Sequence, residues 1–525
     1  MSRSPEQRWQ RAIGYLEQGQ YAAAHAQLEA LQAALPGDVR THLLASEIAW
    51  REDRVRDGSA HARDAAEAGT MDPGVLCAVV EALLRVGEVA LARECLARPP
   101  LADSDEPRWL LKLADYRQRL DENAEALRLI ESAIARGATG AEVRFHHGVQ
   151  LYFNGCLGEA EAELEASLRA DPPSGRAALA LSRLRRQSPE DNHLDLLAEG
   201  LGQVPHGAMD KPALLFAQYK VFEDLGRNED AWRALELGNA LMHARNPREA
   251  AVQRAFLARL IEACGEDAVK PRSEPDDGPQ PIFIVGMPRS GTTVLERMLG
   301  NHSQVRSAGE LVDFELQVRR AADTRRIHAE TFTGRIADLD LDEVGRCYLA
   351  QTRWRARGRR FFIDKQPPNW MLAGLIHAAL PGARILHLVR DPMDVCFSNW
   401  RAFFGDTYGY SYDIADLAAH HDSYRRTMAH WHKVMPGAVL DVPYERLVRE
   451  PDTMMRRVFA FCGLDWEPGC TDMRGNAEPV ATLSAAQVRE PLHSRAFGEW
   501  QRYAVHLAPL REALSRNQVS EAIGS

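Results

Sequence analysis

The chain has 525 residues, 45% of them hydrophobic and 26% charged, and a formal net charge of −10 at pH 7. This length allows two or more domains, and the negative charge argues against general binding to nucleic acid. The N-terminus lacks the apolar core of a signal peptide, and no run of about 18 apolar residues predicts a membrane span, so we expect a cytoplasmic protein. The eight cysteines are scattered without a CxxC pair, which favours reduced thiols over disulfides or a zinc site.

The first half of the chain repeats with a period of 34 residues. Turn-forming residues recur at this spacing, each followed five positions later by a small residue: Gly19 and Ala24, Asp53 and Gly58, Gly87 and Ala92, Asp121 and Ala126, Gly155 and Ala160. The small residue lets the second of two antiparallel helices approach the first. The period resembles that of the tetratricopeptide repeat, which implies a helical solenoid over residues 8–245. Such an array either acts as a scaffold or offers a groove for a peptide or partner protein, and the sequence favours neither.

Helical periodicity stops in a stretch rich in Pro, Gly and Asp, GEDAVKPRSEPDDGPQP. A helical connection and linker is therefore predicted at residues 246–280. Beyond it, apolar runs such as IFIV, RFFI and RILHLV alternate with helical patterns, which predicts an α/β domain with a parallel sheet over residues 281–515.

The first strand of this domain leads into a loop of the phosphate-binding kind, in IFIVGMPRSGTTVLERML. Gly286 and Gly291 have the spacing of the P-loop, but Thr292 stands where that motif has its lysine. Backbone N–H groups at the start of the next helix make an anion site that needs no metal. A ligand whose reactive end is less charged than that of ATP needs the lysine less, and a phosphosulfate ester meets this description.

A second strand-to-helix stretch, ILHLVRDPMDVCFSNW, carries Arg390 at the strand end and Ser398 two helical turns later. A guanidinium and a hydroxyl at these positions can converge on one phosphate. Taken alone, the stretch fits equally well an arginine paired with Asp391 or Asp394.

Together, PRSGTT and LVRDPMDVCFS resemble the 5′-phosphosulfate and 3′-phosphate motifs of sulfotransferases that use 3′-phosphoadenosine 5′-phosphosulfate (PAPS). The resemblance is strongest with protein-tyrosine sulfotransferases and with bacterial sulfotransferases that carry tetratricopeptide repeats. It implies a P-loop-like sulfotransferase domain with PAPS as co-substrate and no metal. It also implies that the 5′-phosphosulfate and the 3′-phosphate are held by two groups of residues: Arg289, Ser290, Gly291, Thr292 and Thr293 for the first, Arg390 and Ser398 for the second.

The same resemblance implies the catalytic groups. Glu310, in VRSAGELVDF, stands where the family has its general base, and Lys365, in RFFIDKQPPNW, stands where it has its catalytic lysine. Lys365 and Arg289 are then expected to stabilise charge on the bridging oxygen and the transferred sulfuryl group. Without the resemblance, the glutamate fits a helix cap and the lysine a solvated surface residue.

Two later segments add less specific matches. VPYERLVREP resembles the family's segment with a tyrosine near the nucleotide, here Tyr444, and TLSAAQVREP the loop with a donor-binding serine, here Ser484. The chain departs from the pattern at Glu499, which precedes a tryptophan where the protein-tyrosine branch has a basic residue. Arg502, or else Arg495, is expected to supply that charge.

The predicted function is in-line transfer of a sulfuryl group from PAPS to an acceptor hydroxyl. A kinase or NTPase with the same loop remains an alternative, but it needs a lysine at position 292 and a magnesium carboxylate, for which Asp364 is the obvious candidate. A non-catalytic scaffold with a degenerate second half is the other alternative. The acceptor stays open between a peptidyl tyrosine, a glycan hydroxyl and a small-molecule alcohol, and the array favours a peptide or protein.

Overall fold

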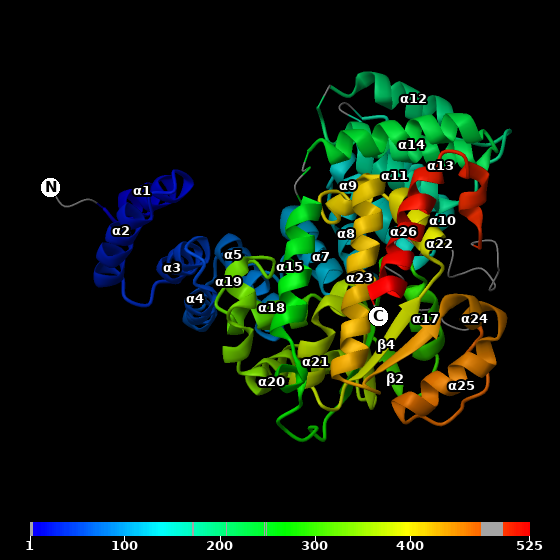
Figure 1. Ribbon diagram of the computed structural model, residues 1–525. Coiled ribbons are helices and arrows are strands. Elements are labelled where there is room, and N and C mark those ends of the chain that lie inside the picture. Colours follow the sequence, from blue (N-terminus) through cyan, green and yellow to red (C-terminus); the bar gives the residue numbers. More distant parts are fainter. Residues whose placement is uncertain are drawn as a thin grey trace.

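The computed structural model describes residues 4–170, 173–205, 207–245, 247, 249–473 and 497–524. A long helical array precedes an α/β domain (Figure 1), which is the fold class expected from the sequence. The array helices are α1 (Pro5–Glu17), α2 (Tyr21–Ala34), α3 (Val39–Arg51), α4 (Val55–Ala68), α5 (Pro73–Val86), α6 (Val89–Leu96), α7 (Pro107–Arg119), α8 (Asn123–Ala135), α9 (Ala141–Asn154), α10 (Leu157–Leu168), α11 (Gly175–Leu184), α12 (Leu194–Gln203), α13 (Asp210–Asp224) and α14 (Asn228–His243).

The turns inside the array are those that the periodic spacing predicted. Each of the five turn residues adopts a positive φ: Gly19 (70°), Asp53 (63°), Gly87 (83°), Asp121 (60°) and Gly155 (93°). The small residue five positions after each of them is buried, because the neighbouring helix packs directly on it. The helix-pair organisation predicted from the period is therefore confirmed.

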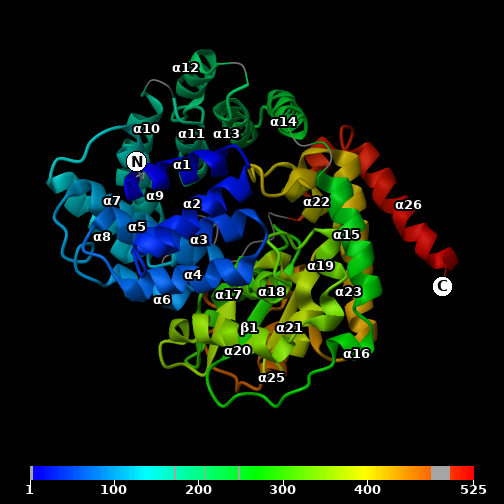
Figure 2. The same ribbon diagram turned by 90° about the vertical axis from the view of Figure 1, so that its left-hand side faces the viewer.

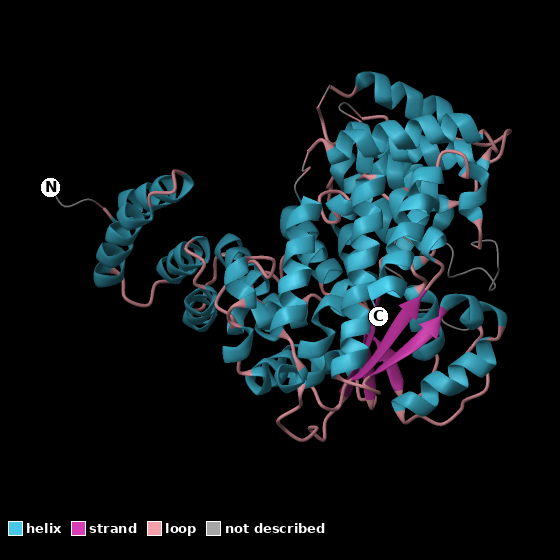
Figure 3. Cartoon of the chain, in the orientation of Figure 1, coloured by secondary structure: helices cyan, strands magenta, loops and turns pink. Residues whose placement is uncertain are grey.

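Five parallel strands form a sheet in the second domain (Figure 3), in the order β2–β3–β1–β4–β5. They are β1 (Gln280–Gly286), β2 (Val305–Ser307), β3 (Phe361–Asp364), β4 (Arg384–Val389) and β5 (Val439–Pro443). Along β1, Ile282 and Ile284 enter one hydrophobic cluster, whereas Phe283 and Val285 enter another. Both faces of the sheet are therefore covered, as is usual for parallel sheets.

The remaining helices cover these two faces and connect the array to the sheet. They are α15 (Glu249–Ala263), α16 (Glu266–Val269), α17 (Thr292–Gly300), α18 (Asp313–Ala321), α19 (Glu330–Thr333), α20 (Leu341–Thr352), α21 (Ala373–Ala379), α22 (Pro392–Trp400), α23 (Ile414–Val434), α24 (Tyr444–Arg449), α25 (Pro451–Cys462) and α26 (Ala508–Gly524). Short 3-10 helices are η1 (Ile336–Asp338), η2 (Arg353–Ala356), η3 (Pro367–Leu372), η4 (Gly409–Tyr412) and η8 (Glu499–Tyr503).

The direction of the chain switches at the centre of the sheet. After β1 the chain runs to the edge strand β2, whereas after β4 it runs to β5 at the opposite edge. The loops at the carboxyl ends of two such strands diverge, and α/β sheets bind their ligands at this point. Gly286 lies directly beside Leu388 in the register, so the loops after β1 and β4 begin at the same level.

The array packs along the second domain. Figure 2 shows α4 and α6 beside α18 and α20, in agreement with the contacts between these helices. Asp53 accepts hydrogen bonds from Thr324 Oγ1 (3.1 Å) and from the backbone N–H of Arg325 (2.6 Å). The Gly87 carbonyl accepts a hydrogen bond from Gln317 Nε2 (3.0 Å). Successive repeat turns therefore touch the second domain.

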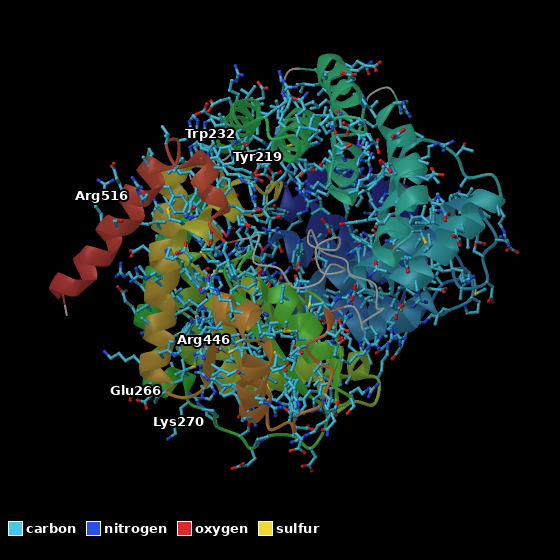
Figure 4. All side chains as sticks on the ribbon, turned by 90° about the vertical axis from the view of Figure 1, so that its right-hand side faces the viewer. Tyr219, Trp232, Glu266, Lys270, Arg446 and Arg516 are labelled. Carbon is cyan, nitrogen blue, oxygen red and sulfur yellow. The ribbon has the colours of Figure 1, made fainter. Side chains whose placement is uncertain are left out.

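The last array helices share a hydrophobic core with the second domain. Phe216 of α13 packs edge-on against Phe403, with ring centroids 5.4 Å apart. Trp232 of α14 stacks on His506, with centroids 4.5 Å apart and an interplanar angle of 13°. Figure 4 shows Trp232 and Tyr219 close together next to the C-terminal segment. The array is thus joined to the second domain by polar turns and by an apolar core.

The structure gives further observations on the expectations drawn from composition. No helix within the described ranges has both the length and the apolarity that crossing a membrane requires. All eight cysteines are free thiols. Burial raises the pKa of Cys264 and of Cys462 to about 12, so both stay protonated near neutral pH.

Candidate active site

Two glycines shape the loop between β1 and α17. A Cβ on Gly286 would lie 2.8 Å from the Leu388 carbonyl oxygen and 3.0 Å from Ser290 Oγ. Gly291 has a φ of +104°, and a Cβ there would collide with the ring of Tyr444. Only glycine fits at these positions, which explains the spacing that marks the loop in the sequence.

The loop combines backbone strain with an unsatisfied polar group. Arg289 has a φ of +67°, a conformation that costs a non-glycine residue on the order of 1 kcal/mol or more. Ser290 Oγ is buried and has no hydrogen-bond partner among the described residues. Thr292 and Thr293, at the start of α17, are also buried. An orphan hydroxyl beside the N–H groups of a helix start is a feature of anion-binding loops.

Two residues that follow β4 hold this loop in place. Arg390 donates from Nη1 to the Arg289 carbonyl (2.9 Å), and its guanidinium lies 5.0 Å from the ring centroid of Tyr444. Asn399 of α22 donates from Nδ2 to the Pro288 carbonyl (2.7 Å). The sequence did not single out Asn399. Its only signal was an asparagine inside a helix, where side chains that can hydrogen-bond to the backbone are disfavoured.

The structure brings most of the predicted nucleotide contacts together around the loop. Ser398 lies in α22 next to Asn399 and is 3% exposed. The ring of Tyr444, the first residue of α24, packs against Gly291. Ser484 and Arg495 lie outside the described residues.

A lysine–glutamate pair follows β3. Lys365 is 1% exposed; its Nζ contacts Glu310 Oε1 and lies 3.7 Å from Glu296 Oε2. Its backbone N–H donates to the Gly309 carbonyl (2.9 Å), which ties β3 to the loop that carries Glu310. Burial disfavours the ammonium form, but Glu296 and Glu310 outweigh it and raise the pKa of Lys365. Lys365 is a fixed positive charge, whereas the Glu310 side chain remains half exposed.

A further carboxylate reaches this pair from the array. A Cβ on Gly309 would lie 2.9 Å from Oδ2 of Asp121, the turn residue between α7 and α8. The Asp121 residue is exposed overall, but its carboxyl group lies against Gly309 of the second domain and is partly withdrawn from water there. This burial, and after it the charge of Glu296, raises the pKa of Asp121 to about 6. The charge of Asp121 in turn helps to raise the pKa of Lys365. The sequence marked Asp121 only as a turn residue.

Asp364 precedes Lys365 but faces the core. It is 0% exposed and accepts a hydrogen bond from the hydroxyl of Tyr348 (2.9 Å). Burial raises its pKa well above the usual value for aspartate. A carboxyl that is fully buried, bonded to a tyrosine hydroxyl and disfavoured in its charged form is a poor ligand for magnesium, so Asp364 does not suit the role that an NTPase would require.

Arginines gather around the β1–α17 loop. Burial, followed by the charges of Arg401, Arg183 and Arg390, lowers the pKa of Arg289 to about 10. One member of this group, Arg183, belongs to the array helix α11. The sequence gave no indication of it, because nothing in a repeat pattern tells which end of a helix meets another domain.

Glu499, the departure from the family pattern, has a partner within this group. It accepts a hydrogen bond from Arg401, which also pairs with Glu223 of α13 (Nη1 to Oε1, 3.3 Å). Glu499 and Glu223 therefore neutralise Arg401 from two sides. Arg502 lies exposed on η8, and its expected role toward the donor stays a prediction.

A parallel sheet with a glycine-shaped loop after its first strand defines a P-loop-like α/β domain. Residues 281–468 match the model of the Sulfotransferase family. The second domain is therefore similar to the sulfotransferase family over these residues, and the chain joins it to a tetratricopeptide-like array.

Relatives of the chain include proteins with and without an assigned activity. An uncharacterized protein of Aquifex aeolicus is 29% identical over 372 residues, which cover 68% of this chain and 48% of that protein. The nodulation protein NoeE of Sinorhizobium fredii is 27% identical, over 36% of this chain and 52% of that protein. Protein-tyrosine sulfotransferase 2 of Gallus gallus is 24% identical, over 42% of this chain and 62% of that protein. The chain thus spans about half the length of the first two of these relatives.

Proposed function

We propose that the chain is a sulfotransferase that moves a sulfuryl group from PAPS to an acceptor hydroxyl. The observation that carries this proposal is the meeting of three features at the carboxyl ends of β1, β3 and β4. These are the glycine-shaped loop, the Lys365–Glu310 pair and Arg390, which donates a hydrogen bond to the loop. The family of the second domain supports the same reaction class.

The loop residues fit the phosphosulfate end of PAPS. The start of α17 offers backbone N–H groups, and the orphan Ser290 Oγ offers one further donor. Thr292 and Thr293 supply hydroxyls, and Gly291 lets the chain approach a ligand closely. Arg289 adds a cation beside the loop. PAPS, when bound, supplies the activated sulfuryl group for the reaction.

Arg390 and Ser398 are proposed for the 3′-phosphate. The first is fixed by its hydrogen bond to the loop, and the second lies buried on the helix that follows β4. Tyr444 and Ser484 are proposed as further nucleotide contacts. A phosphate held at this place also neutralises part of the positive charge around Arg289.

Glu310 is proposed as the general base. It takes the proton of the acceptor hydroxyl while the hydroxyl oxygen forms a bond to sulfur. The bond from sulfur to the bridging phosphate oxygen breaks, and 3′-phosphoadenosine 5′-phosphate (PAP) leaves. Lys365 and Arg289 stabilise the charge that develops on the bridging oxygen and the sulfuryl group. The half-exposed Glu310 can reach an acceptor, whereas Lys365 is held in place by carboxylates.

A hydroxyl of a peptide or protein, in particular a peptidyl tyrosine, is the proposed acceptor. The similarity to proteins named protein-tyrosine sulfotransferase supports this choice. The array supports it too, because helical repeats present extended surfaces that suit extended ligands.

The test is a calorimetric titration of the full chain with PAP and, for comparison, with ATP and magnesium. We expect selective binding of PAP, weakened about tenfold or more in Arg390→Ala, because a charged hydrogen bond to phosphate is lost. Arg384→Ala is the matched control, since this arginine lies at the opposite end of the same strand. Binding of ATP with magnesium, or of neither nucleotide, would overturn the proposal.

A further inference from the structure

Glu296 is a buried glutamate beside the Lys365–Glu310 pair. It lies in α17, the helix that begins at the loop after β1, and it is 7% exposed. Its Oε2 lies 3.7 Å from Lys365 Nζ, and its Oε1 accepts a hydrogen bond from Ser307 Oγ at the end of β2 (2.6 Å). Glutamates are seldom buried to this extent unless they are paired, and Lys365 is the charged partner of this one.

A closed ring of hydrogen bonds and one ion pair fixes Glu296 relative to Lys365. The backbone N–H of Gly309 donates to Ser307 Oγ (3.3 Å), and the backbone N–H of Lys365 donates to the Gly309 carbonyl (2.9 Å). Ser307 Oγ in turn donates to Glu296, whose other oxygen faces the Lys365 ammonium. The ring joins α17, β2 and β3, so it holds both the backbone and the side chain of Lys365.

The helix α17 connects this carboxylate to the loop after β1. Thr292 and Glu296 are four residues apart on the helix, so they lie on the same face, one above the other. Thr292 is one of the residues proposed for the phosphosulfate. The helix that starts at the proposed anion site therefore also carries the carboxylate that holds the lysine.

The two glutamates beside Lys365 differ in the part that the reaction gives them. Glu310 is the proposed base, so it loses its negative charge each time it takes the proton of an acceptor, and its side chain is half exposed. Glu296 is buried and takes no part in that proton transfer. While Glu310 is protonated, the buried Lys365 ammonium still needs a negative partner, because an uncompensated charge away from water is costly.

Other charged groups lie near this pair as well. Burial disfavours the ammonium form of Lys365; the charges that oppose burial and raise its pKa are those of Glu296, then Glu310, and then Asp121 from the array. Arg355 of η2 attenuates the contribution from the array, because its own charge acts on Asp121. Glu296 is thus the carboxylate next to Lys365 that belongs neither to the proton transfer nor to the array.

We propose that Glu296 is a positioning residue for the transfer reaction. It holds the Lys365 ammonium in place and compensates its charge while Glu310 carries the acceptor proton, and Ser307 fixes the carboxylate for this task. Glu296 acts through Lys365 and is not itself a catalytic residue. The inference rests on the proposed function, since it takes Lys365 and Glu310 in the roles proposed above.

The first test is the pH dependence of sulfuryl transfer from PAPS to a tyrosine-containing peptide, measured on the full chain. It compares the wild type with Glu296→Gln, Glu296→Asp and Glu88→Gln. Glu88 is the matched control, because it too is a buried glutamate (6% exposed) that accepts a hydrogen bond from a serine, Ser59 (2.9 Å).

We expect Glu296→Gln to lower kcat about tenfold to 10²-fold and to leave the KM for PAPS within a few-fold, because the lysine is needed mainly in the transition state. The alkaline fall of kcat should move to lower pH, because the ammonium has lost a negative partner and releases its proton more easily. Glu296→Asp keeps the charge, so its alkaline fall should stay near that of the wild type while kcat drops several-fold. Glu88→Gln should change neither quantity.

The second test measures the Lys365 ammonium directly and does not depend on turnover. The chain has six lysines, so carbon NMR of lysine-labelled protein can follow each of them, and Lys365→Arg assigns the signal. Glu296→Gln should lower the pKa of Lys365 by about 1–3 units, whereas Glu88→Gln should leave it unchanged.

An unchanged pKa of Lys365 in Glu296→Gln overturns the inference, as does a lower kcat with an unmoved alkaline fall. If Glu296→Gln does not fold, Glu296→Asp decides, and a wild-type kcat in that variant overturns the inference. If the wild type transfers no sulfuryl group, the proposed function falls, but a lowered pKa in Glu296→Gln still supports Glu296 as the partner of Lys365. If the wild type is active and the pKa does not move, the inference alone falls.

Discussion

The repeat turns and the loop after β1 both contain residues with left-handed backbone, but this conformation serves a different purpose in each. In the array, the five residues with positive φ recur at a fixed spacing, and each lets two helices pack on a small residue. In the loop, Arg289 has positive φ beside a buried Ser290 hydroxyl without a described partner. The first arrangement is complete by packing alone. The second leaves a buried hydroxyl without a described partner, which is expected of a loop that binds a ligand.

Three of the array turns touch the second domain, and two of these carry aspartate instead of glycine. Asp53 binds Thr324 and the Arg325 backbone, and Asp121 lies against Gly309. The two aspartates make these contacts through their side chains, whereas the regular turn at Gly87 makes its contact through the backbone carbonyl.

The largest effect on activity is expected at the Lys365–Glu310 pair. Glu310→Gln should lower kcat about 10²-fold to 10⁴-fold, because the proposed base is lost. The melting temperature should barely change, because the Glu310 side chain is half exposed. Turnover of PAPS with a tyrosine-containing peptide is the measurement, and Glu330→Gln, an exposed carboxylate on α19, is the control. Activity within a few-fold of the wild type would remove Glu310 from the role of base.

A second experiment tests whether Gly291 in the loop after β1 differs from a glycine in an ordinary turn. Gly291→Ala should cost about 1–3 kcal/mol in the free energy of unfolding and abolish measurable PAP binding, because its Cβ meets the Tyr444 ring. Gly437→Ala has a comparable φ, +81°, but no neighbour within 4 Å, so it should show the backbone cost alone. Chemical denaturation and calorimetry on both variants are the measurements. Equal effects on PAP binding would contradict the special role of Gly291.

The smallest effect concerns the aspartate turn at Asp121. Its pKa is raised from 3.8 to about 6, so the folded state keeps a proton that the unfolded state has lost. The stability contribution of this group therefore falls as pH rises from about 4 to about 6. Asp121→Asn removes that fall, so the variant should gain relative to the wild type over this range, by a few degrees at most because the residue is open to solvent.

Thermal unfolding of Asp121→Asn at several pH values between 4 and 8 checks this expectation. Asp53→Asn serves as the control, since it changes the equivalent turn of another repeat. A difference between Asp121→Asn and wild type that stays constant across the range would show that Asp121 does not carry a raised pKa.

The array and the sheet were predictable because their signals are local. A turn residue and a small residue five positions apart, or an apolar run before a glycine, specify their structure with few distant contacts. The motifs around Gly291 and Arg390 were also recognisable, and the parallel register of β1 and β4 explains why they meet. The roles of Ser398 and Tyr444 toward a nucleotide remain predictions.

The residues that sequence analysis missed depend on contacts between distant segments. Asn399 matters through the Pro288 carbonyl, Asp121 through Gly309, and Arg183 through Arg289. In each case the side chain looks ordinary within its own helix or turn. Its significance comes from a partner on a distant segment, which lies in the same domain for Asn399 and in the other part of the protein for Asp121 and Arg183.

The core that Phe216 shares with Phe403 determines whether the array and the second domain can be separated from each other. A repeat array attached by a flexible tether is exchangeable, because cutting the tether exposes little apolar surface. Here a cut between the two parts would uncover aromatic rings on both. The two parts should therefore unfold in one cooperative transition. Either part could be combined with a different domain only if that domain offered a matching apolar surface.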